Sequence, residues 1–179
     1  MLIFSRLVLP YILTLFFVLK YILMQQIIYD FFHNIPLMSA LISTIIAQII
    51  KLVINIIVYK KPDLYLIVAT GGMPSSHTAC VGALWMSIVL IHGLISTECA
   101  IASVLAGIVY RDAVGVRRQA GIHASILNNL TMRENDENDP TPQLLKPLKT
   151  LLGHTPTQAL VGLAEGIVVG LIVTLFVFS

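Results

Sequence analysis

Long apolar segments dominate the chain. A helix that crosses a bilayer needs about 20 mostly apolar residues, and five segments fit, at approximately 7–28, 36–58, 77–96, 98–116 and 157–178. The first has the charged start of a signal peptide, but Lys20 interrupts its core and no small-residue cleavage site follows. The pattern therefore predicts an all-α, polytopic membrane helix bundle with about five transmembrane helices.

We expect two parts along the chain. Residues 1–33 form an N-terminal membrane anchor helix and turn, and residues 34–179 form one membrane domain that carries a polar loop at 128–145. The row Gly162, Gly166, Gly170 is typical of close helix packing in lipid.

Composition agrees with the apolar pattern. Hydrophobic types make up 57% of the 179 residues and charged types 11%, against about 25% charged in a typical soluble domain. A net charge of +2 is too small to indicate nucleic-acid binding. Cys80 and Cys99 lie inside apolar stretches without metal-ligand spacing, so we interpret them as packing residues.

The basic residues are unevenly distributed between the two sets of connections. The connections at 59–76 and 117–156 hold seven Lys and Arg residues, whereas 29–35 and 96–98 hold none. The positive-inside rule places the first set in the cytosol. The sequence thus predicts an integral protein of a plasma or inner membrane, with its functional site facing the cytosol.

Three clusters that carry chemistry fall on this predicted cytosolic face. GGMPSSHTA (71–79) has two glycines, a helix start at Pro74, two hydroxyls and His77, which together are typical of an anion site at a helix N-terminus, or of a plain cap. YRDAVGVRRQAG (110–121) places Asp112 about one turn inside a span, before Arg117 and Arg118. LLGHTPTQALVG (151–162) places His154 before a helix that starts near Pro156.

Two ionisable residues lie deeper in the predicted spans. Counted from Tyr59 and Pro156, Lys51 and Glu165 lie roughly 12–14 Å below the same face. An unpaired charge at such depth is costly, which favours a Lys51–Glu165 ion pair. The alternative is that Lys51 extends its side chain towards the surface cluster to bind an anion.

The combined set of residues favours phosphoryl transfer without a metal or other cofactor. One histidine attacks phosphorus, the other protonates the leaving oxygen, and cations neutralise the remaining oxygens. The chain has no HExxH motif, carboxylate cluster or cysteine pair for a metal, and no G-x-S-x-G elbow for a serine hydrolase.

The three motifs GGMPSSH, DAVGVRRQAG and LGHTP, in this order, resemble the divergent branch of the type 2 phosphatidic acid phosphatase superfamily, which also includes vanadium-dependent haloperoxidases. The parent motifs are K-x6-R-P, P-S-G-H and S-R-x5-H-x3-D. The resemblance implies that His154 is the nucleophile, that His77 is the general acid, and that Ser75 and Ser76 donate to phosphate. Lys51 with Lys61-Pro62 is a loose counterpart of the first motif.

Two departures from the parent motifs separate the functional hypotheses. Gln158 stands where the parent has the aspartate that orients the nucleophilic histidine, and the serine–arginine pair is absent. Asp112 could supply the missing charge, and Arg117 or Arg118 the missing cation. The leading hypothesis is a membrane phosphatase acting on a lipid or polyprenyl phosphate. The alternative is a lipid-phosphate-binding membrane protein that has lost turnover. The sequence leaves the oligomeric state open, homo-oligomers included.

Overall fold

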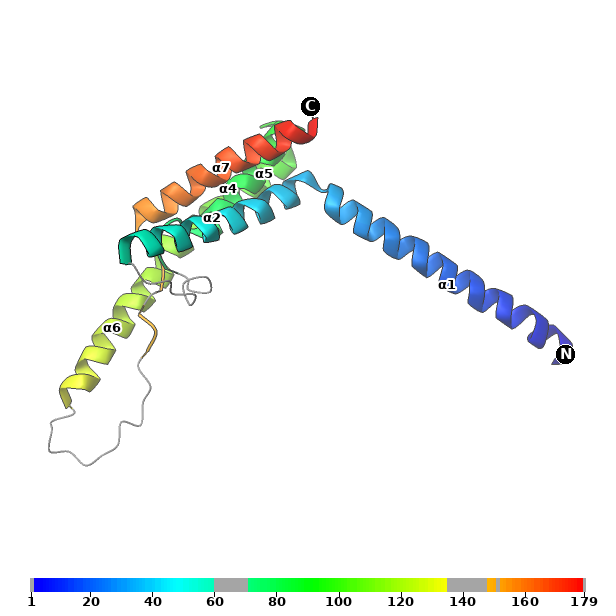
Figure 1. Ribbon diagram of the computed structural model, residues 1–179, viewed down its shortest axis with the longest axis horizontal. Coiled ribbons are helices and arrows are strands. Elements are labelled where there is room, and N and C mark those ends of the chain that lie inside the picture. Colours follow the sequence, from blue (N-terminus) through cyan, green and yellow to red (C-terminus); the bar gives the residue numbers. More distant parts are fainter. Residues whose placement is uncertain (1, 60–70, 135–147, 151, 179) are drawn as a thin grey trace.

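A computed structural model describes residues 2–59, 71–134, 148–150 and 152–178, and this part of the chain is helical apart from its connections (Figure 1). No strand occurs among these residues. The helices, in chain order, are α1 (Leu2–His33), α2 (Ile35–Tyr59), α4 (Ser76–His92), α5 (Thr97–Val114), α6 (Val116–Glu134) and α7 (Pro156–Phe178).

Helices α2, α4, α5 and α7 form a bundle with α4 at its centre. Helix α4 packs against α2, α5 and α7, and its closest neighbour is α7. Helix α1 extends away from the bundle at the start of α2, and α6 continues from the end of α5 and leaves the bundle at the opposite end (Figure 1). Among the described helices, α1 contacts α2 alone.

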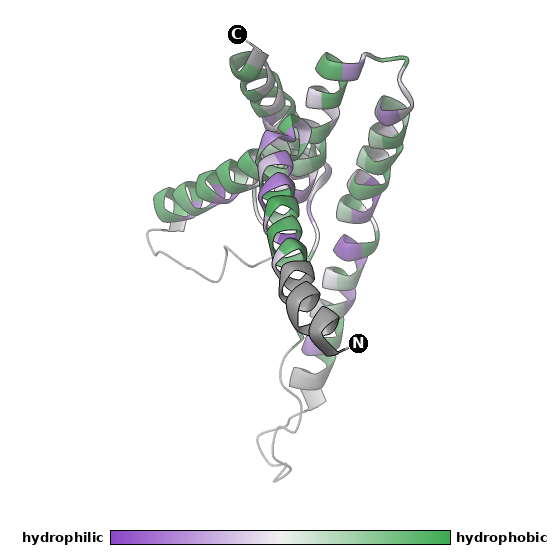
Figure 2. Ribbon diagram, turned by 90° about the vertical axis from the view of Figure 1, so that its right-hand side faces the viewer, coloured by the Kyte–Doolittle hydropathy of each residue, from purple (hydrophilic) through white to green (hydrophobic). Residues whose placement is uncertain are grey.

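The lengths and compositions of the helices confirm the predicted membrane class. Within the described part of the chain, four helical stretches are long and apolar enough to cross a membrane: Thr14–His33, Ile35–Val58, Thr97–Leu130 and Pro156–Val177. The predicted span at 77–96 corresponds to α4, an apolar helix of 17 residues. It is about 26 Å long against a hydrocarbon core of about 30 Å. Hydrophobic residues predominate along the helices of the bundle (Figure 2).

The α4–α7 contact is made by small residues, as the glycine row predicted. Gly166 lies so close to Ala79 that a Cβ atom added to Gly166 would collide with the Ala79 carbonyl oxygen. Two hydrogen bonds add to this contact, from Thr78 Oγ1 to the Ala159 carbonyl (2.8 Å) and from Thr174 Oγ1 to Ser87 Oγ (2.8 Å). Close backbone approach and hydroxyl bonds of this kind hold helices together in lipid, where apolar burial gives little driving force.

The predicted polar loop at 128–145 begins too early. Residues 128–134 are still helical, because α6 runs to Glu134, while residues 135–147 lie outside the described part of the chain. No proline that would break the helix occurs between Val116 and Pro140. The Asn128 side chain then bonds both backbone groups of Leu148 at 2.9 Å, which returns the chain to α6.

Candidate active site

Segments that are far apart in the sequence meet at the end of the bundle where α4 and α7 begin and α5 ends. Ser75 N donates to the Gln158 carbonyl (3.3 Å), and His154 N donates to the Ala113 carbonyl (3.0 Å). These backbone bonds join the start of α4 to the start of α7, and the loop before α7 to the end of α5. The three motif clusters are therefore brought together, as the sequence predicted.

A small cavity lies where these segments meet, and we call it the cup. It has a volume of about 60 Å³ and is lined by two histidines, a charged pair and two small apolar residues: His77, His154, Asp112, Arg117, Val109 and Ala113. At about 30 Å³ per water molecule it holds about two, so it is on the scale of one small anionic group. Both imidazoles thus face one space of the size of their predicted ligand.

His154 is the best defined member of the cup. Its side chain is buried, and its Nδ1 lies 2.9 Å from the Gly72 carbonyl oxygen. A carbonyl oxygen only accepts hydrogen bonds, so Nδ1 carries the proton and Nε2 keeps its lone pair. Burial lowers the pKa of His154, and the positive charge of Lys51 adds to this, while hydrogen bonding to Gly72 and Gln158 opposes it. The net direction favours a neutral ring.

The Gly72 carbonyl is a functional group that the sequence analysis missed. Gly72 has φ +92°, a region that residues with a Cβ rarely adopt, and this conformation accompanies a carbonyl directed at His154. The signal available in the sequence is the Gly71-Gly72 pair. A backbone acceptor therefore holds the ring of His154.

Asp112 and Arg117 form an ion pair on the wall of the cup, with the Arg117 Nε donating to the Asp112 carboxylate. Their side chains remain 40% and 44% exposed, so the pair contributes little stability by itself. Its effect is to hold both groups beside the histidines. That Asp112 supplies the charge missing at Gln158 stays a prediction.

Lys51 lies beside the cup, and its predicted ion pair with Glu165 is wrong. The Lys51 side chain is 3% exposed, and its methylene carbons lie next to Gly72. Glu165 instead accepts a hydrogen bond from Ser43 Oγ at 3.0 Å. Ser43 and Lys51 are eight residues apart on α2, or about 12 Å along its axis. The prediction failed because depth was counted from Tyr59, and α2 extends beyond the level of the cup.

The two serines of the second motif do not line the cup. Ser75 is fully buried, and its hydroxyl caps α4 by accepting from Thr78 N. The Ser76 hydroxyl accepts from Gln48 Nε2 at 3.2 Å. Both hydroxyls, predicted as phosphate donors, are thus engaged in holding α4 in place.

The remaining predicted residues occupy three different positions. Gln158 and Thr155 form a capping box at the start of α7, in which Gln158 Oε1 accepts from Thr155 N (3.0 Å) and Thr155 Oγ1 accepts from Gln158 N (3.3 Å). Arg118 lines a separate open groove on the other side of His154. Lys61 lies outside the described residues.

The fold and the cup define a polytopic helical membrane protein with a histidine-lined site at one end of its bundle. The family comparison gives this class a more specific identity. Residues 32–169 match the family described as "Divergent PAP2 family", and the chain belongs to that family.

A curated relative is also described as a membrane protein. The "Uncharacterized membrane protein YuiD" of Bacillus subtilis (strain 168) is 42% identical over 151 residues, which cover 80% of this chain and 96% of that protein. No solved structure matches this chain significantly. The resemblance seen in the three motifs is therefore confirmed at the level of the family.

Proposed function

We propose that this protein is an integral membrane phosphatase that hydrolyses a lipid or polyprenyl phosphate through a phosphohistidine intermediate. The observation that carries the proposal is the cup itself, because His77 and His154 line one cavity although they come from different segments. Membership of a phosphatase-related family supports the same class of reaction.

His154 has the features that a nucleophile needs. The Gly72 carbonyl fixes the proton on Nδ1, so Nε2 is the atom with a lone pair. Since burial lowers the pKa of His154, the ring is neutral at pH 7 and able to attack. Attack forms an Nε2–P bond while the bond from phosphorus to the lipid oxygen breaks.

His77 and the cations complete the proposed cycle. His77 gives a proton to the departing lipid oxygen, and Arg117, which lines the cup, and Lys51, which lies beside Gly72, neutralise the phosphoryl oxygens. Water then attacks phosphorus, His77 accepts its proton, and the Nε2–P bond breaks to release phosphate. The seven basic residues in the connections on this side favour a cytosolic site.

The test is phosphate release by the purified, reconstituted protein with a chelator present. The substrates are phosphatidic acid and a polyprenyl monophosphate, and the variants are His154→Asn, His77→Asn and the control His92→Asn, whose residue ends α4 far from the cup. Loss of the nucleophile should lower turnover by at least about 10³-fold, while His92→Asn should match the wild type. Turnover that survives His154→Asn would refute the assignment.

A second candidate function is binding of a lipid phosphate without turnover. The specific observation in its favour is that Gln158 Oε1, which replaces the parent aspartate, is part of the capping box with Thr155. An amide cannot stabilise an imidazolium as a carboxylate does. If the wild type binds phosphatidic acid, loses this binding in Arg117→Gln, and releases no phosphate from either substrate, this second function holds.

A further inference from the structure

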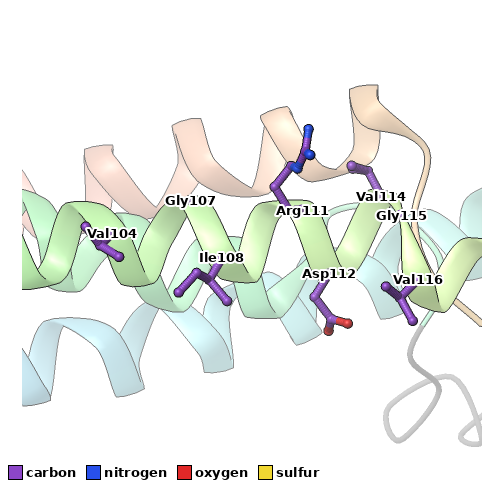
Figure 3. Close-up of a pocket in the computed structure, with 8 residues that line it drawn as sticks. All are labelled: Val104, Gly107, Ile108, Arg111, Asp112, Val114, Gly115 and Val116. Atoms are coloured by element: carbon purple, nitrogen blue, oxygen red, sulfur yellow. The ribbon is translucent and has the colours of Figure 1, made fainter.

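A second, larger concavity opens on the outer face of α5 where this helix meets α6. It has a volume of about 780 Å³, and we call it the α5 groove. Along α5, Val104, Ile108 and Asp112 line it at four-residue intervals, and Val116 at the start of α6 follows them (Figure 3). The groove is therefore apolar along most of its length and charged near one end.

Glycines make this face hollow. Gly107 and Gly115 both line the groove, and a Cβ atom added to Gly107 would meet no atom within 4 Å. Gly115 also ends α5, so the chain bends there before α6 begins. The apolar side chains on either side are open to the surroundings, with Val104 64% and Ile108 61% exposed.

The α5 groove adjoins the cup. Asp112 lines both, so one wall residue separates the two spaces. Val104 lies eight residues before Asp112, or about 12 Å further into the bundle along the helix axis. A molecule with its phosphate in the cup thus has a direct path for an apolar part along α5, away from the charged end.

We propose that the α5 groove holds the hydrocarbon chain of a lipid monophosphate whose phosphate occupies the cup. This inference deepens the proposed function and rests on its ligand class. A chain that moves from bilayer to groove exchanges one apolar environment for another, so the groove adds little affinity of its own. What it contributes is position, because a chain fixed along α5 aims the phosphate at the two histidines.

The experiment uses photoactivatable lipids with the reconstituted full-length protein. Phosphatidic acid and a polyprenyl monophosphate, each with a diazirine in the chain, are cross-linked and the labelled residues are mapped by mass spectrometry. Diacylglycerol with the same labelled chain tests whether the phosphate is needed. Gly107→Leu fills the groove, and Ala164→Leu adds similar bulk on an exposed position of α7.

We expect at least one of the two phosphates to label residues 104–116 preferentially, and diacylglycerol to label them no more than other exposed apolar helices. Gly107→Leu should reduce this labelling about tenfold, and Ala164→Leu should leave it unchanged. A size-exclusion profile like that of the wild type verifies that each variant is folded. If Gly107→Leu does not fold, Gly107→Ala replaces it and should give a smaller reduction in labelling.

Even labelling of all exposed helices by both phosphates would overturn the inference. Equal labelling of the groove by diacylglycerol, or no effect of filling the groove in a folded variant, would also overturn it. The readout is binding, not turnover. Preferential groove labelling by a protein that releases no phosphate would therefore refute the proposed phosphatase and leave the chain site standing.

Discussion

Replacement of Gly166 by alanine tests whether contact between the α4 and α7 backbones holds the bundle together. The added Cβ would collide with the Ala79 carbonyl oxygen, a backbone atom that cannot rotate away. The two helices must then separate, and overpacking of this kind costs about 1–3 kcal/mol. The helix propensity of alanine offsets little of this, because an unfolded segment in lipid stays helical.

The control is Gly107→Ala, the same chemical change at a position of α5 where the new Cβ meets nothing within 4 Å. Thermal unfolding in detergent can be followed by the fluorescence of Trp85, the single tryptophan, whose indole donates to Ser103 on α5. Gly166→Ala should lower the midpoint by about 2–4 °C for each kcal/mol lost, and the control should leave it near the wild type. Equal midpoints for the two variants would refute the close-contact argument.

Three further predictions concern single groups near the cup and in the membrane. Because burial lowers the pKa of His154, the folded state binds fewer protons there than the unfolded state, so its contribution to stability is complete above about pH 6.5 and is lost as pH falls below that value. Unfolding midpoints between pH 5 and 8 should show this loss in the wild type and a smaller one in His154→Asn. Glu165→Gln keeps an acceptor for Ser43 and should leave the unfolding midpoint at pH 8 unchanged or raised. A loss of about 3–5 kcal/mol of unfolding free energy at pH 8 is the cost of breaking a buried ion pair. Such a loss in Glu165→Gln would support the Lys51–Glu165 ion pair instead. Thr155→Val removes one bond of the capping box and should cost about 1 kcal/mol in the same assay, whereas an unchanged midpoint would mean that the box adds no stability.

The helical membrane class and the meeting of the motifs could be predicted because both follow from apolar segment length. His77, Asp112 and His154 each lie near an end of a predicted span, and all three of these ends are on the same membrane face. A bundle of these spans therefore places the three residues on one side. The close approach at Gly166 was predictable in the same way, because glycines four residues apart share one helix face.

The partners of individual groups could not be predicted, because they depend on rotation and on depth along each helix axis. The partner of Lys51 depends on the depth of the cup along the α2 axis. The apolar pattern of the sequence does not show that depth. The Gly72 carbonyl has no side-chain signal at all. Ser75 and Ser76 were assigned to phosphate from a motif, but a hydroxyl at a helix start serves equally as a cap.

The two side-chain hydrogen bonds between α4 and α7 fix the relative position of these helices beside the cup. Thr78 and Ser87 anchor α4 to its neighbour at two levels, about 13 Å apart along the axis. With these two hydrogen bonds in place, α7 cannot slide along α4 or rotate against it without breaking one of them. The α4–α7 side of the cup is therefore held in place, while Asp112 and Arg117 line it from the segment where α5 ends and α6 begins.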